Sequence, residues 1–245
     1  MLTPLKALWS SVVEYYYDLP RMVLLNIFWF ITALPALLVA LGIAQLVSEL
    51  TDWQQLVLNV WIVPVVVVVL ALFGPGTAAI YYVTNRLANG ELLEIMRFWH
   101  GFRHFFWRGW ALATLNVAAG ALLVLNVVFY WTMGGIGLKL LSVVFAYLLV
   151  LWFAIQGYLF ALMVELDQSI RLVVRNALFL AIDNLGLTLG LLVVNVIVIL
   201  FSVPPWSAAL LLPLATMTIA SYANNKVVVE AVDRYRAAGR ILKDT

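Results

Sequence analysis

The sequence predicts an all-α protein, a polytopic integral membrane helical bundle, and three observations support this class. The chain is 65% hydrophobic and 11% charged, with a mean hydropathy of +1.05, whereas soluble domains are roughly half apolar and a quarter charged. Several charge-free runs exceed the ~20 residues that a spanning helix needs. These runs lack the alternation of barrel strands, and backbone polar groups in hydrocarbon must be satisfied within each span, so helices are expected.

Six spanning helices are expected, arranged as three hairpins in a single membrane domain over residues 1–245. The last apolar run extends from Asn184 to Asn225 and contains the Pro204-Pro205 pair. Proline interrupts a helix, so this run is expected to form two helices joined by a tight turn. The expected spans are residues 21–47, 56–84, 109–131, 140–164, 185–202 and 206–224.

The basic residues predict the orientation of these spans. Of the fourteen Lys and Arg residues, all but Lys139 fall on one side of the expected membrane. Short loops rich in Lys and Arg stay cytoplasmic, so both the N-terminus and the C-terminus are predicted to be cytoplasmic. Tryptophans collect at membrane boundaries, and Trp53, Trp131 and Trp206 lie at the expected outer boundary.

Amphipathic segments precede each pair of spans on the cytoplasmic side. They comprise residues 3–17, 91–108 and 166–182, and a charged C-terminal helix is expected at 226–243. Such helices lie in the headgroup plane with basic residues toward anionic lipid, or pack against a partner. The most aromatic segment therefore provides a candidate surface for a cytoplasmic partner or for anionic lipid headgroups, formed by Arg97, His100, Arg103, His104 and Arg108.

The Gly74-Pro75-Gly76-Thr77 sequence lies near the cytoplasmic end of the second expected span. Gly-Pro-Gly is not expected to continue a regular helix, so a new helical piece is predicted from Thr77 to Leu87. We interpret the element as a kink or hinge. The alternative is a ligand element, because the free amides at the start of a helix favour anions and polar groups.

The expected spans carry amides rather than charges near the midplane. Asn126, Gln156 and Asn195 are candidates for a polar bundle interior. Ionisable residues within membranes ordinarily mark ion paths and proton relays, so their absence argues against a proton-coupled transporter. Hydrogen bonds between helices are the simpler role for these amides, and a site for a neutral ligand is the alternative.

No catalytic residue, cofactor or metal site is predicted. The chain has no Cys, and it lacks a phosphate loop ending in Gly-Lys-Ser/Thr, a His-Glu-x-x-His motif and a Gly-x-Ser-x-Gly motif. His100 and His104 are four residues apart, but a metal site needs further ligands from another segment. The formal charge of +2 is too small to indicate nucleic-acid binding. The protein is therefore interpreted as a non-enzyme.

The order of features resembles the YesL-like family of bacterial integral membrane proteins, a family defined by a domain of unknown function. The resemblance is carried by Leu25-Asn26-Ile27-Phe28-Trp29 with Leu34-Pro35, Gly74 to Val83, Gly90-Glu91, and Phe98 to Trp107. In that family the first two elements lie close together, whereas here Ala36 to Leu72 separates them. The resemblance implies a multi-pass protein of the bacterial cytoplasmic (inner) membrane, associated with carbohydrate uptake and without catalytic residues.

These observations favour an accessory or regulatory membrane protein that contacts sugar transporter subunits through its cytoplasmic surface. Two alternatives stay open. One is a small permease that itself acts on a neutral solute as a homo-oligomer, with Gly74 to Thr77 lining the path. The other is a purely structural or scaffold membrane protein.

Overall fold

The structure is a computed structural model that describes residues 18–48, 71–202 and 212–237, together with Lys6, Trp9, Val13, Tyr16, Val67 and Val69. Every regular element in this described part of the chain is an α-helix, which confirms the predicted all-α class. The helices are α2 (Leu19–Ser48), α5 (Phe73–Ala88), α6 (Arg97–Thr132), α7 (Ile136–Leu166), α8 (Ile170–Asp183), α9 (Leu185–Ser202) and α10 (Leu212–Ala237).

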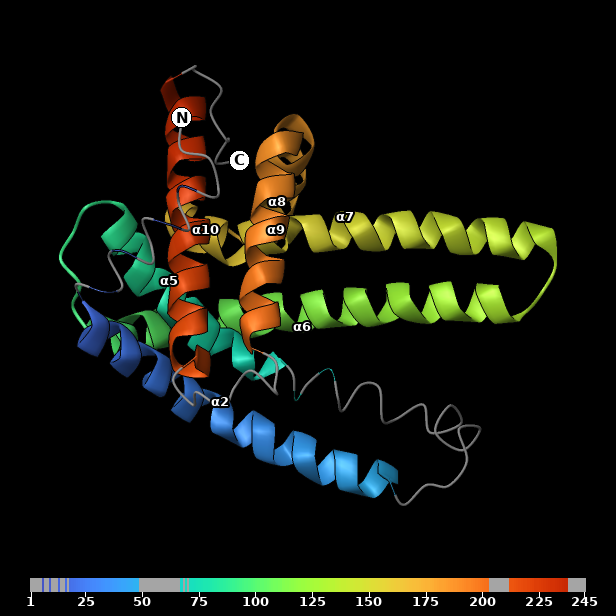
Figure 1. Cartoon of the computed structure of the whole chain (residues 1–245), viewed down its shortest axis with the longest axis horizontal. Helices are drawn as coiled ribbons and strands as arrows, with labels where there is room; N and C mark the ends of the chain where they lie inside the picture. The colour runs from blue at the N-terminus through green and yellow to red at the C-terminus, as the bar shows by residue number, and fades with distance from the viewer. Residues whose placement is uncertain are drawn as a thin grey trace.

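Helices α6 and α7 form a long antiparallel hairpin that extends away from the other labelled helices (Figure 1). They have 36 and 31 residues, which corresponds to lengths of about 54 and 46 Å. The chain turns at Gly134 and Gly135, whose φ angles of 75° and 80° suit a residue without a Cβ. We call this end the tip of the hairpin and the opposite end, near α5, its base.

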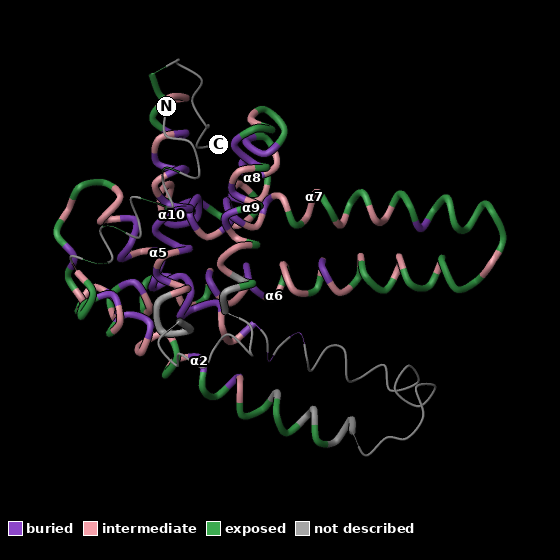
Figure 2. The backbone as a smooth tube through the Cα atoms, in the orientation of Figure 1, coloured by how far each residue is buried: buried purple, intermediate pink, exposed green. Residues whose placement is uncertain are grey.

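The outer part of the hairpin is barely buried within the chain. Figure 2 shows mostly exposed and half-buried residues along both of its helices toward the tip. Large apolar side chains are exposed there, among them Leu122, Phe129, Leu140 and Val150. An apolar helix pair of this length with so little burial requires a nonpolar surrounding.

Three of the described helical stretches are long and apolar enough to cross a membrane, namely Leu19–Val39 of α2, all of α6 and all of α7. Helices α8 and α9 add a fourth candidate only if they count as one broken span, because they meet at a bend of 108°. By length and composition these helices indicate a membrane-embedded protein.

Helix α5 lies at the centre of the bundle and contacts α2, α6, α7 and α10. Glycines permit the close approach of α6. A Cβ atom added to Gly74 of α5 would lie 2.3 Å from the backbone oxygen of Gly109, and a Cβ atom added to Gly101 of α6 would lie 2.7 Å from the ring of Tyr82. Small residues at helix crossings allow backbones to pack in this way, and the middle of α5 is consequently buried.

Helix α10 is held by hydrogen bonds as well as by apolar packing. Its buried polar residues, each at most 1% exposed, are Thr218, Ser221, Asn224 and Asn225. Asn225 Nδ2 donates to the backbone oxygen of Tyr81 at 2.9 Å and to Thr84 Oγ1 at 2.8 Å, both on α5. Thr218 bonds Asn26 of α2. Paired polar groups in a low-dielectric interior favour one arrangement of the helices over others.

The predicted arrangement of six spans in three hairpins is not confirmed. The α6–α7 hairpin matches the expected spans 109–131 and 140–164, and α9 coincides with the expected span 185–202. In Figure 1, however, α9 and α10 run across the direction of this hairpin rather than along it. The polar residues of α10 provide a physical reason, since its orientation brings them to hydrogen-bonding partners on α2, α5 and α9.

Several predicted boundaries differ in the structure. The sequence predicts separate segments at 91–108 and 109–131, but α6 continues without a break from Arg97 to Thr132, because Gly101 and Gly109 are accommodated by packing on α5. Residues 212–224 of an expected span and residues 226–237 of the expected charged helix likewise belong to one helix, α10, and the remainder of both lies outside the described residues. The amphipathic segment 166–182 corresponds to α8. Segment 3–17, most of the first half of span 56–84, Trp53 and Trp206 lie outside the described residues, apart from the isolated positions named above.

Candidate functional site

Charged and polar side chains from α5, α6, α7 and α10 gather at the base of the hairpin. The connection from α5 to α6 turns at Gly90, whose φ of 83° is readily adopted by glycine. This turn brings Glu91 between two arginines. Glu91 accepts a hydrogen bond from Arg86 Nη1 at 2.8 Å and pairs with Arg97. Arg97 also binds both carboxylate oxygens of Glu94, each at 2.9 Å.

These contacts change the acidity of the groups involved. The hydrogen bond from Arg86, followed by that from Arg97, holds the pKa of Glu91 below its usual value. The pKa of Arg97 is raised by its hydrogen bonds to Glu94 and Glu91. Both side chains of the Glu91–Arg97 pair are about a third exposed, so the ion pairs orient the connection more than they stabilise the fold.

We expect the Glu91 contacts to make stability depend on pH. The folded-state pKa of Glu91 lies below its unfolded value of about 4.3, so its stabilising contribution is present above that pH and is lost as the pH falls through the folded-state pKa. Thermal unfolding in detergent, followed by circular dichroism, should show wild type more stable than Glu91→Gln at about pH 6, with the difference shrinking toward about pH 3. A difference that stays constant over this range would contradict the assignment.

A second group of contacts joins the start of α6 to the end of α7. Asp167 ends α7 in the left-handed conformation with φ 49°, which is uncommon for residues other than glycine. Its carboxylate pairs with Arg108 at 2.7 Å and lies 3.5 Å from His104 Nε2, and Arg108 also donates to its backbone oxygen at 3.1 Å. The arginine therefore binds both the side chain and the backbone of the residue that ends α7.

Glu165 is the most buried carboxylate of this region, with 7% of its side chain exposed. Its Oε2 accepts hydrogen bonds from Asn85 Nδ2 at 2.9 Å and from Asn89 Nδ2 at 3.3 Å. Its Oε1 lies 3.4 Å from Arg236 Nη1 of α10. A buried carboxylate is tolerated when donors of this kind satisfy it, and Glu165 thereby ties α7 to both α5 and α10.

Two hollows meet at the histidines of α6. A cavity of about 590 Å³, which we call the base cavity, is lined by Tyr82, Asn85, Arg86, Asn89, Glu91, His100, His104, Phe105, Val164, Glu165 and Asp167. A more open hollow of about 780 Å³, which we call the outer groove, is lined by Met96, Trp99, His100, Arg103 and His104. The first lies among α5, α6 and α7, and the second runs along α6.

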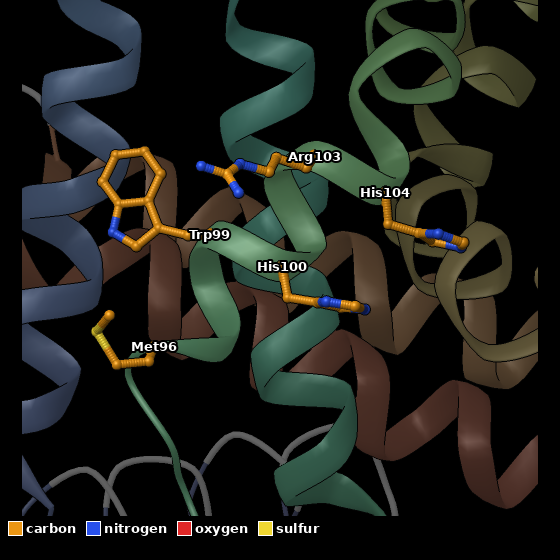
Figure 3. Close-up of a pocket in the computed structure, with 5 residues that line it drawn as sticks. All are labelled: Met96, Trp99, His100, Arg103 and His104. Atoms are coloured by element: carbon orange, nitrogen blue, oxygen red, sulfur yellow. The ribbon is translucent and has the colours of Figure 1, made fainter.

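Figure 3 shows how the five outer-groove residues are oriented on α6. The rings of His100 and His104 lie one above the other and point to the same side, while Met96, Trp99 and Arg103 point to the other side. The two imidazole rings are stacked, with centroids 6.2 Å apart and planes 9° apart. His100 also lies beside the ring of Tyr82 in α5. The two histidines therefore line both the base cavity and the outer groove.

The structure brings together only part of the predicted basic surface. Arg97 and Arg108 pair with acidic residues, and His104 lies beside Asp167. Arg103 is exposed and has no ion pair within the described part of the chain. The predicted surface is therefore not a continuous array of free positive charge. Among the described residues, the polar groups of this surface without an ion pair or a hydrogen bond are Arg103 and the imidazole of His100.

The Gly74 to Thr77 element lies at the start of α5, which begins at Phe73 rather than at the predicted Thr77. Pro75 is compatible with this position because the first turn of a helix needs no backbone N–H donor. Gly74 packs against Gly109, and Thr77 Oγ1 accepts a hydrogen bond from Trp29 Nε1 at 3.1 Å. All four residues are buried, so the structure places them in contacts between helices.

The three predicted interior amides lie in separate places. Gln156 of α7 and Asn116 of α6 exchange two hydrogen bonds at 2.7 and 3.0 Å. Asn195 of α9 and Asn224 of α10 do the same at 3.1 and 3.2 Å. Asn126 is half-buried in the outer part of α6, and its Nδ2 donates to Leu122 of its own helix at 2.7 Å. The three amides therefore belong to three separate sets of hydrogen bonds.

The sequence interpretation missed the acidic side of the base, especially Glu165 and Asp167, and the amides Asn85 and Asn89. One signal was available. Arg108 precedes the apolar part of α6 and Asp167 follows that of α7, so an antiparallel hairpin necessarily brings the two charges to one level. Within the described residues, no group of three or more His, Asp or Glu side chains is arranged to hold a metal ion.

No family model, curated protein or solved structure matches this chain.

Proposed function

We propose that this chain is a non-enzymatic membrane protein that acts as an accessory subunit and docks a partner at the base of the α6–α7 hairpin. On the resemblance in its sequence, we further propose that the partner belongs to a carbohydrate uptake system. The alternatives of a permease and a scaffold remain predictions. The proposal is supported by the unequal chemistry of the two ends of the hairpin.

Between Arg108 and Glu165 the sequence contains one charged residue, Lys139. It lies near the tip, with Nζ 5.7 Å from the centre of the Trp131 ring, as is typical of a membrane boundary. Arg108 and Trp131 are separated by about 35 Å along α6, close to the ~30 Å thickness of the hydrocarbon layer. We therefore propose that α6 and α7 cross the bilayer between these levels, and α2 beside them.

The arginines at the base then favour a cytoplasmic location for that end, because short basic segments stay inside. Both termini would then lie on the cytoplasmic side of a bacterial inner membrane. Anionic lipid headgroups would lie at the level of Arg103. The six-span arrangement remains a prediction for the segments outside α2, α6 and α7. In this placement the base cavity and the outer groove open toward the cytoplasm.

The outer groove is the part of the base best suited to a partner. Met96 is 75% exposed, and Arg103 adds a positive charge free of any ion pair in the described structure. An exposed apolar side chain next to an unpaired arginine and a tryptophan is typical of residues that dominate binding energy. The amide pairs Asn116–Gln156 and Asn195–Asn224 satisfy each other, which disfavours a ligand path between those helices.

Copurification from native membranes tests this proposal. We expect a partner protein to be recovered with the wild-type chain in mild detergent after cross-linking, and we expect Met96→Ser combined with Arg103→Glu to lower its recovery about tenfold. Both positions are exposed, so the fold should tolerate the changes. Recovery is quantified by mass spectrometry against the amount of the bait.

The matched control makes the same kinds of change at the other end of the hairpin, with Leu140→Ser and Lys139→Glu. Leu140 is 65% exposed, and this variant should retain the partner. Recovery of the wild-type chain alone, or equal loss in both variants, would contradict docking at the base.

A further inference from the structure

Asn126 differs in its hydrogen bonding from the other amides between α5 and α10. From α5 to α10, each other Asn or Gln side chain whose bonds are described reaches a second side chain, such as Gln156 for Asn116 and Asn224 for Asn195. Among the residues that the structure describes, Asn126 bonds only the backbone oxygen of Leu122 in its own helix. Its side-chain oxygen accepts no hydrogen bond from the described residues.

The depth of Asn126 makes this oxygen significant. Trp131 and Lys139 mark the membrane boundary at the tip in the placement argued above. Asn126 lies about 8 Å further along α6 toward the base, which is inside the hydrocarbon. A polar group without a partner is unfavourable there, because lipid chains provide no donors. A donor from another protein surface would satisfy it.

The residues around Asn126 form a stripe suited to packing against another helix. On α6 they recur at alternating spacings of four and three residues, a heptad pattern typical of a helix–helix seam. The stripe consists of Leu115, Ala119, Leu122, Asn126, Phe129 and Met133. Its four large apolar members are between 50% and 62% exposed. Asn126 therefore lies within an exposed apolar seam.

This seam is distinct from the face of α6 that contacts α7. The contacts with α7 are made through Asn116, Gly120, Val127 and Tyr130. Since each residue turns a helix by about 100°, these positions lie about a quarter turn from the stripe. A further helix can thus pack on the stripe while the α6–α7 hairpin stays intact.

We propose that the stripe is the interface of a parallel homodimer, in which Asn126 of one copy exchanges two hydrogen bonds with Asn126 of the second. A second copy in the same membrane has the same orientation, so a two-fold axis along the membrane normal brings identical levels of α6 together. The amide is self-complementary, as the reciprocal pairs Asn116–Gln156 and Asn195–Asn224 illustrate within this chain. Buried asparagines at such seam positions specify register and partner number.

The absence of native cysteine allows a direct test with the full chain in lipid vesicles. Single-cysteine variants Leu122→Cys and Phe129→Cys should form disulfide-linked dimers on mild oxidation. Val124→Cys and Val128→Cys, which are exposed on the opposite side of α6, should form few. Equal cross-linking at all four positions, or none at any of them, would overturn the proposed interface.

The role of the amide is tested by Asn126→Leu. We expect the dimer dissociation constant in vesicles, measured by energy transfer between labelled chains, to rise about tenfold, and Asn126→Gln to retain most of the affinity. Asn126 bonds no other side chain among the described residues of its own copy, so the monomer should fold in either variant. A wild-type chain that stays monomeric at all protein-to-lipid ratios, or an unchanged constant in Asn126→Leu, would overturn the proposal. Partner recovery at the base is measured separately, so failure of one proposal does not imply failure of the other.

Discussion

Replacing Gly74 by alanine is expected to destabilise the protein by about 3 kcal/mol or more. The added Cβ atom would lie 2.3 Å from the backbone oxygen of Gly109 and 2.7 Å from the Cβ atom of Ala113. Neither atom belongs to a flexible side chain, so α5 and α6 would have to separate. Separation would loosen contacts of the most buried helix of the bundle, because α5 also packs on α2, α7 and α10.

The same glycine-to-alanine substitution at two other positions provides reference values for the loss of stability. A Cβ atom at Gly109 would come no closer than 3.0 Å to its neighbours, and one at Gly42 of α2 has nothing within 4 Å. Gly109→Ala should therefore have an intermediate effect. Gly42→Ala should stabilise by about 0.5–1 kcal/mol, since alanine is the better helix former. Thermal unfolding in one detergent should rank the three variants in this order, and a Gly74→Ala protein as stable as Gly42→Ala would contradict the described packing.

Asn224→Leu is expected to cost about 3 kcal/mol of stability. Asn224 Nδ2 donates to the hydroxyl of Tyr81 at 2.8 Å, and its amide exchanges two hydrogen bonds with Asn195. Leucine fills a similar volume but leaves the phenol and the second amide without these partners. Each polar group left unsatisfied in a buried site destabilises by about 1–3 kcal/mol.

A double-mutant cycle separates hydrogen bonding from packing. If the Asn195–Asn224 pair is formed, Asn195→Leu combined with Asn224→Leu should cost less than the sum of the single changes, by about 1 kcal/mol. Asn126→Leu is the matched control, measured under monomeric conditions, because Asn126 bonds no second side chain in the described part of the protein. Additive effects in the cycle, or an equal loss of stability in the control, would contradict the pairing.

The helical class and the α6–α7 hairpin could be predicted because they depend on local properties. Apolar runs between charges predict helices, and Gly134-Gly135 between two such runs predicts a turn. The continuity of α6 was not predictable in this way, because the amphipathic pattern of residues 91–108 predicts a helix in the headgroup plane, separate from the span 109–131. Its packing on α5, with Gly101 opposite Tyr82 and Gly109 opposite Gly74, depends on residues distant in the sequence.

The base of the hairpin was predicted as a basic surface, and the structure changes its chemistry. Arg97 and Arg108 do not provide free positive charge, because they form ion pairs with Glu94 and Asp167. Glu94 is close to Arg97 in sequence, whereas Asp167 follows a different helix. Pairing between distant residues cannot be inferred from the composition of one segment, so the sequence predicts the basic residues of α6 without their acidic partners on the end of α7.

The sequence by itself determined that this protein is helical and membrane-embedded, and that its charges concentrate at one end of its long apolar runs. These properties follow from hydropathy and helical periodicity, which act over a few turns of one chain segment. Only the tertiary structure decided that α9 and α10 run across the direction of the hairpin, that Glu165 is buried among amides, and that Asn126 bonds its own helix. The reason is that a buried polar group needs a hydrogen-bonding partner, and for most of these groups the partner lies tens of residues away in the chain.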